Sequence, residues 1–114
     1  MARVLAHLPD LLFGSKVRGM LVAAGHDVQA TASAAAVVDA DLLVLDLCED
    51  ATARLAAFGP AIGATRTLAF YLHTDVETRS AALAAGCDRV VPRSRMAREG
   101  AALVDGLLAV DVSG

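Results

Sequence analysis

Short apolar runs alternate along the chain with longer segments in which apolar residues recur every three or four positions. The clearest run is Leu42–Leu47, where four consecutive apolar residues precede Asp46, a pattern typical of a strand buried on both faces. Five segments are predicted to be strands: Arg3–His7, Val28–Ala30, Leu42–Leu47, Thr67–Leu72 and a short part of Asp88–Pro92. Asp46 stands where its strand leaves the core, so its carboxylate is the first candidate for chemistry.

Helical periodicity and turn residues predict a helix after each strand. The expected helices are Leu11–Ala24, Ala34–Val38, Ala51–Phe58, Val76–Ala85 and Arg95–Val110. Gly25 is placed to end the first helix in the left-handed conformation, and Gly86 is expected to end the fourth. Gly59-Pro60 is expected to end the third helix, because proline removes a backbone donor, and Ala61–Arg66 is then expected to be a loop or an irregular turn.

Strands and helices that alternate in this way form a parallel sheet covered on both faces. With right-handed crossovers, they predict an α/β fold of the flavodoxin-like (βα)5 type. This is a three-layer sandwich whose parallel five-stranded sheet has the order 2-1-3-4-5. Residues 1–114 are expected to form one domain with a frayed tail after about residue 110. Ser33 is expected to cap the second helix, and Thr74 or Asp75 the fourth.

Composition narrows the classes of function. The 114 residues are 56% hydrophobic and 4% aromatic, so the core must be mostly aliphatic. A net charge of -3 argues against a general nucleic-acid binder. Cys48 and Cys87 form no CxxC pair and are expected to be buried free thiols. No signal peptide or membrane span is recognisable, so we expect a cytoplasmic protein that does not associate with membranes.

Ligands of this fold class collect at the carboxyl ends of the strands. The candidate side chains at that edge are Asp10, Asp46, His73, Thr74, Arg93, Ser94 and Arg95. No GxGxxG motif follows the first strand. A metal site of His7, Asp46 and His73 is less favoured than histidines bonded to the backbone, and a Ser94–His73–Asp46 triad lacks a nucleophile elbow. An enzyme with its own turnover is therefore not expected.

Three stretches resemble motifs of a known family. Asp41–Leu47 is similar to a strand motif that ends in a phosphoacceptor Asp, here Asp46. Ala82–Asp88 is similar to an A-x-x-x-G-A-D stretch, and Val91–Ser94 falls where the family has a Lys-Pro pair. Over nearly its whole length the chain thus resembles the receiver domain of two-component response regulators. The chain also resembles a divergent bacterial receiver-like group. This second resemblance rests on the run Leu11–Val17 together with residues 86–90 and 92–94.

The resemblance implies phosphoryl transfer to Asp46 with Mg²⁺, but the sequence departs from the family at the other positions that this chemistry uses. The family's acidic pair aligns with Leu8-Pro9, which leaves Asp10 as a remnant of the acidic pocket. The hydroxyl position falls near Leu72, and the Lys position holds Arg93.

An arginine can hold a carboxylate through two hydrogen bonds. We therefore hypothesise that Arg93 or Arg95 pairs with Asp46 in place of a metal; the alternative is that both arginines are solvated.

These departures predict a stand-alone atypical receiver, or pseudo-receiver, that acts as a protein-interaction module in signalling. We expect no cofactor and no conventional Mg²⁺-dependent phosphorylation. A protein partner or a second copy is expected on the face built from the fourth helix, fifth strand and fifth helix, which carries Arg79, Arg89 and Arg98. One alternative is a functional phosphoacceptor that uses Asp46 and Asp10 with Mg²⁺. Another is a module that binds small anions or nucleotides at the same edge.

Overall fold

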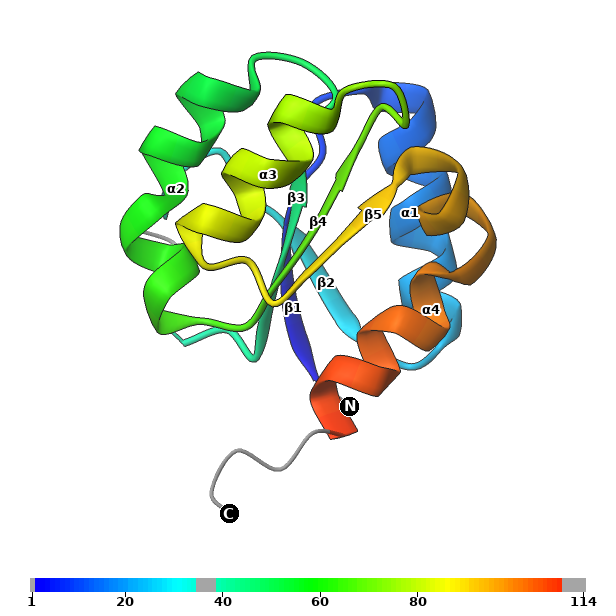
Figure 1. Ribbon diagram of the computed structural model, residues 1–114. Coiled ribbons are helices and arrows are strands. Elements are labelled where there is room, and N and C mark those ends of the chain that lie inside the picture. Colours follow the sequence, from blue (N-terminus) through cyan, green and yellow to red (C-terminus); the bar gives the residue numbers. More distant parts are fainter. Residues whose placement is uncertain (1, 35–38, 110–114) are drawn as a thin grey trace.

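The computed structural model describes residues 2–34 and 39–109, and its centre is a parallel sheet (Figure 1). The strands are β1 (Arg3–His7), β2 (Asp27–Ala30), β3 (Leu42–Asp46), β4 (Thr67–Tyr71) and β5 (Arg89–Pro92). They form one five-stranded sheet in the order β2-β1-β3-β4-β5. The predicted flavodoxin-like topology is therefore confirmed.

The helices of the described residues cover both faces of this sheet. They are α1 (Leu11–Ala23), α2 (Ala51–Ala64), α3 (Val76–Ala85) and α4 (Arg93–Ala109). α1 and α4 pack on one face, and α2 and α3 pack on the other (Figure 1). None of these helices is long and apolar enough to span a bilayer.

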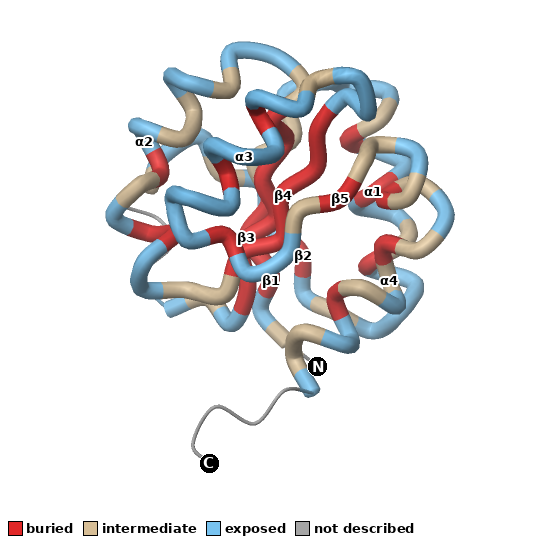
Figure 2. Tube along the Cα trace, in the orientation of Figure 1, coloured by how far each residue is buried: buried red, intermediate tan, exposed pale blue. Residues whose placement is uncertain are grey.

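Alternation along the strands divides the core into two clusters. Leu42 and Val44 of β3 face α1 and α4, where they meet Met96 and Val104, among others. Leu43 and Leu45 face the opposite side and meet the buried residues of α2 and α3. Figure 2 shows the resulting pattern, in which buried strands lie inside a shell of exposed helix surface. β3 is buried along its whole length because it is the central strand.

The third predicted helix is longer than expected. A loop was predicted over Ala61–Arg66, but residues 61–64 belong to the helix, so that prediction is wrong for these four residues. α2 continues through Gly59-Pro60 to Ala64. Burial explains this, because Phe58 and Ile62 lie on both sides of the proline and are 1% and 2% exposed. Burying such side chains stabilises by roughly 1.5–3 kcal/mol each, which offsets the cost of an internal proline, about 3 kcal/mol. Ala56, whose carbonyl loses its usual donor, is exposed to water.

Several predicted helix ends are confirmed by their caps. Gly25 has a positive φ of 95°, the left-handed conformation predicted for it, and Gly86, which ends α3 as expected, has a φ of 104°. Asp75, and not Thr74, caps α3 by accepting a hydrogen bond from the Thr78 N–H.

One predicted helix begins earlier than expected, and two other predictions fall mostly outside the described residues. α4 begins at Arg93, two residues earlier than predicted, because it follows β5 without a loop. Most of the predicted helix Ala34–Val38 and the tail after Ala109 lie outside the described residues.

The start of α1 lies unusually close to the segment that follows β1. A Cβ atom added at Gly14 would lie 3.0 Å from the Leu8 Cβ and 3.0 Å from the Leu8 carbonyl oxygen. By contrast, a Cβ atom added at Gly19, in the same helix, would meet nothing within 4 Å. The absence of a side chain at Gly14 therefore allows α1 to hold Leu8 in place.

The two glycines of α1 give a matched prediction. Gly14→Ala should lower the free energy of unfolding by about 1–3 kcal/mol, since the methyl group must displace backbone. Gly19→Ala should raise it by roughly 0.5–1 kcal/mol, because alanine favours the helix and meets no neighbour. Urea unfolding followed by circular dichroism measures both. Equal effects of the two substitutions would contradict the close approach at Gly14.

Candidate functional site

The carboxyl ends of the strands meet at one edge of the sheet, where a cavity of about 350 Å³ opens. Its lining residues are Pro9, Asp10, Asp46, Cys48, Glu49, Arg54, Leu72 and Arg93. Asp46 lies at the end of β3 and is only 4% exposed. A carboxylate that is so buried must be compensated by hydrogen bonds or by an opposite charge. We call this hollow the Asp46 cavity.

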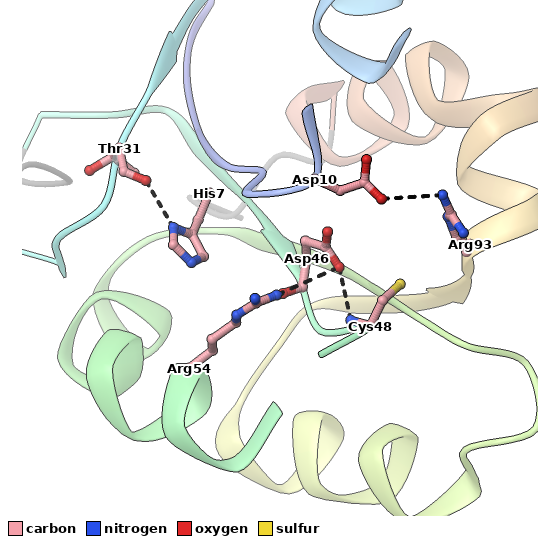
Figure 3. A network of polar contacts seen from close by, with 7 residues as sticks. All are labelled: His7, Asp10, Thr31, Asp46, Cys48, Arg54 and Arg93. Carbon is pink, nitrogen blue, oxygen red and sulfur yellow. Dashed lines mark hydrogen bonds and ion pairs between the residues drawn. The ribbon is translucent and has the colours of Figure 1, made fainter. Parts of the chain in front are cut away.

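Two groups supply that compensation (Figure 3). The Cys48 backbone N–H donates a hydrogen bond of 2.8 Å to the Asp46 Oδ1. The Arg54 Nη1 donates a hydrogen bond of 2.9 Å to the Asp46 main-chain oxygen and lies 3.9 Å from Oδ1. The Arg54 side chain is itself 13% exposed. Asp46 therefore ends its strand inside a pair with a largely buried arginine.

Arg54 reaches Asp46 from the first turn of α2. Asp50 precedes this helix with a φ of 49°, the one positive φ among the described non-glycine residues. Its carbonyl accepts the Arg54 N–H at 2.9 Å, which is the first turn of the helix. Arg54, Phe58 and Ile62 are spaced four residues apart, so they lie on the same stripe of α2, the one that faces the sheet. Sequence reasoning missed Arg54, although this spacing was visible.

The hypothesis that Arg93 or Arg95 pairs with Asp46 is wrong. The Arg93 Nη2 lies 3.6 Å from the Asp10 Oδ2, and its guanidinium carbon lies 4.2 Å from the centre of the Phe13 ring. The Arg95 Nε lies 3.4 Å from the Glu99 Oε2, one turn further along α4. Arg93 is held by α1 because α4 starts at this residue, whereas the prediction placed it in a loop.

Asp10 serves mainly as a helix cap. Its Oδ1 accepts the Phe13 N–H at 3.0 Å at the start of α1, and its other oxygen faces Arg93. A Mg²⁺ ion needs several oxygen ligands in an octahedron, usually with more than one carboxylate free to bind it. Here Asp46 is engaged by Cys48 and Arg54, and Asp10 by Phe13 and Arg93. In the described part of the chain, no three acidic, His or Cys side chains are grouped to hold a metal. The donor set at this edge does not fit Mg²⁺.

The remaining candidate residues lie away from Asp46. His7 is bound to the Thr31 carbonyl oxygen through Nδ1 at 2.9 Å (Figure 3). His73 and Ser94 line a neighbouring cavity together with Arg93, while Thr74 is exposed. The structure thus brings together Asp46, Cys48 and Arg54, and it assembles neither the metal site nor the triad considered above.

Cys48 has an unreactive environment at the edge of the cavity. Burial, together with the charge of the Asp46 carboxylate and a hydrogen bond to it, raises the pKa of its thiol to about 12. The Arg93 and Arg54 guanidinium groups act in the opposite direction and are outweighed. The thiol is therefore protonated at neutral pH and is no nucleophile there.

Several solved structures that resemble this chain are response regulators or their receiver domains. A response regulator from Thermotoga maritima matches with a TM-score of 0.79 and 13% identity, over 96% of this chain and 99% of its own. A response regulator receiver protein from Burkholderia phymatum matches with a TM-score of 0.77 and 18% identity, over 97% and 98%. A CheY-like receiver domain protein from Methanospirillum hungatei JF-1 matches with a TM-score of 0.76 and 18% identity, over 95% and 94%.

These likenesses establish that the chain has the CheY-like receiver fold. No protein-family model matches the chain, and no curated protein matches it by sequence. The function therefore has to be argued from the residues at the site.

The pair between Arg54 and Asp46 gives a stability prediction. Arg54→Ala should lower the free energy of unfolding by about 1–3 kcal/mol, because it leaves a buried carboxylate with fewer partners. Arg98→Ala, whose side chain is 71% exposed beside Glu99, is the control and should change it by no more than about 0.5 kcal/mol. Urea unfolding measures both. Equal losses would show that Arg54 does not compensate Asp46.

The environment of Cys48 gives a reactivity prediction. A pKa of about 12 in place of 9.0 means that the thiolate is about a thousandfold rarer at pH 8, so alkylation by iodoacetamide should slow accordingly. Asp46→Asn should speed it several-fold, since one cause of the raised pKa is removed while burial remains. Peptide mapping by mass spectrometry separates Cys48 from Cys87. Alkylation of Cys48 at the rate of a free thiol would refute the contact with Asp46.

Proposed function

We propose that the chain is an atypical receiver module that signals by binding a protein, without conventional Mg²⁺-dependent phosphorylation. One observation carries this proposal: the Arg54 Nη1 lies 3.9 Å from the carboxylate of Asp46, which matches the family's phosphoacceptor, and is held there by a hydrogen bond to the Asp46 main-chain oxygen. A fixed positive charge beside Asp46 substitutes for the charge that a metal brings in a working receiver. Asp46 on this view is a structural group that ends β3 and anchors α2.

The neighbouring positions support the same reading. Leu8-Pro9 stands where the acidic pair aligns, and Leu8 packs against the core, so no carboxylate can come from there. Leu72 stands near the position of the family's hydroxyl and is 43% exposed. Arg93 replaces the family's Lys and is turned to Asp10 and Phe13. None of the three positions offers the phosphoryl group the contact that the family uses.

The receiver fold supports a signalling role because the solved structures that share it are response regulators. A module without phosphotransfer can still pass a signal if its surface binds a partner. The candidate surfaces include the face of α3, β5 and α4, where Arg79 and Arg89 are exposed.

Incubation with acetyl phosphate and Mg²⁺ tests the proposal. We expect intact mass spectrometry to find no phosphate adduct, and Mg²⁺ alone to leave the melting temperature unchanged, because Asp46 and Asp10 are each paired with an arginine. A receiver with a complete acidic pair serves as the positive control for the phosphodonor.

The second candidate function is that of a phosphoacceptor, which the opening of the Asp46 cavity beside the carboxylate favours. An adduct that forms on the wild-type chain and disappears in Asp46→Asn would establish it and contradict the first proposal.

A further inference from the structure

A second hollow of about 400 Å³ lies beside the Asp46 cavity, between the start of α1, the loop from β4 to α3 and the start of α4. Its lining residues are Phe13, Leu72, His73, Arg93, Ser94 and Ala97. No carboxylate is among them, and Arg93 provides the permanent charge. We call it the Phe13 cavity. Its chemistry, a largely apolar lining with one cation, differs from that of the Asp46 cavity.

Exposed apolar side chains flank this cavity. Six large apolar residues are exposed in the described part of the chain, and four of them belong to the two segments that line the Phe13 cavity. Three of the four form the apolar rim: Leu72 (43%), which lines the cavity, with Leu12 (88%) and Val76 (66%). Leu11 (86%) lines another hollow, between α1 and β2. The start of α1 and the β4–α3 loop lie at the same edge of the sheet (Figure 1). Apolar groups gathered around a hollow in this way mark an interaction site.

Arg93 gives the cavity its preference for charge. Its guanidinium group is stacked on the Phe13 ring, and its side chain is 42% exposed. The 3.6 Å distance to Asp10 is longer than a charge-assisted hydrogen bond, which spans about 2.7–2.9 Å. A guanidinium has five N–H donors, so this contact uses little of its capacity. A second carboxylate can therefore bind Arg93 from the solvent side.

We propose that the Phe13 cavity and the apolar rim dock a segment of a partner protein in which an apolar side chain stands beside an acidic one. The apolar side chain enters the cavity, and the carboxylate pairs with Arg93. This inference rests on the proposed function of protein binding and names the chemistry of the partner. A second copy fits less well, because a symmetric dimer would bring the same patch against itself and place the two Arg93 groups close together.

Selection from a phage-displayed library of random peptides of about 12 residues tests the proposal. The library is first depleted on Leu12→Ser and then selected on the wild-type chain. We expect enriched peptides to share an apolar residue next to Asp or Glu. For one synthetic peptide, fluorescence anisotropy should show about tenfold weaker binding to Leu12→Ser and to Arg93→Gln. Changing the peptide's acid to its amide should weaken binding to the wild type but not to Arg93→Gln, which isolates the ion pair.

Matched controls use two exposed apolar residues that lie off the rim and away from the start of α1. Val22→Ser and Leu83→Ser change side chains that are 52% and 44% exposed, and both variants should bind the peptide as the wild type does. Melting temperatures verify that each variant is folded.

Three results would overturn the docking site. One is the absence of any peptide enriched over a blank surface. Another is loss of peptide binding in Leu83→Ser while Leu12→Ser and Arg93→Gln still bind the peptide, because this result would place the interface on α3. A third is self-association in sedimentation velocity that Leu12→Ser removes, which makes the occupant a second copy. The phosphodonor experiment has a separate readout, so a phosphate adduct on Asp46 would refute the proposed function without affecting the peptide result.

Discussion

Burial of the central strand is the constraint on which the rest of the molecule depends. β3 lies between β1 and β4, and its side chains from Leu42 to Leu45 are fully buried against helices on both faces. Such a strand cannot release its last residue directly into water, so Asp46 still lies inside the protein when the chain turns. A buried carboxylate needs hydrogen bonds and a nearby opposite charge: the Cys48 backbone N–H supplies the hydrogen bond, and Arg54 of the next helix places its charge 3.9 Å from Oδ1. The strand's position in the sheet thereby determines the electrostatics of the site.

The same constraint links the two sides of the sandwich. Arg54 belongs to α2 and covers one face, whereas Asp10 and Arg93 join α1 to α4 on the other. The Asp46 cavity lies between these two ion pairs. Neither pair adds a net charge to the edge, and each engages a carboxylate that could otherwise bind a cation. Asp46 and Asp10 at this edge are thus each paired with an arginine of the same chain.

Much of this fold was predictable from sequence because its periodic signals are strong. β1 and α3 have the predicted bounds, and Gly25 and Gly86 end their helices as expected. The site was less predictable: Asp46 is found by its place after an apolar run, but its contacts depend on how the neighbouring helices pack. Arg54 was overlooked although it stands four residues before Phe58 inside the predicted helix Ala51–Phe58. Arg93 was placed in a loop, whereas α4 begins at this residue and the side chain lies against Asp10 and Phe13. At Gly59-Pro60, tertiary burial outweighed local propensity.

The contact between Leu8 and Gly14 also bears on how such a domain can evolve. Leu8 stands where receivers carry an acid, and here it packs against the core while α1 rests on its backbone. A carboxylate introduced at this position would lose the apolar contacts of leucine and lie against the start of α1. Such a change would therefore need compensating changes in α1. Packing of this kind limits how the sequence at this edge can change while the fold is retained.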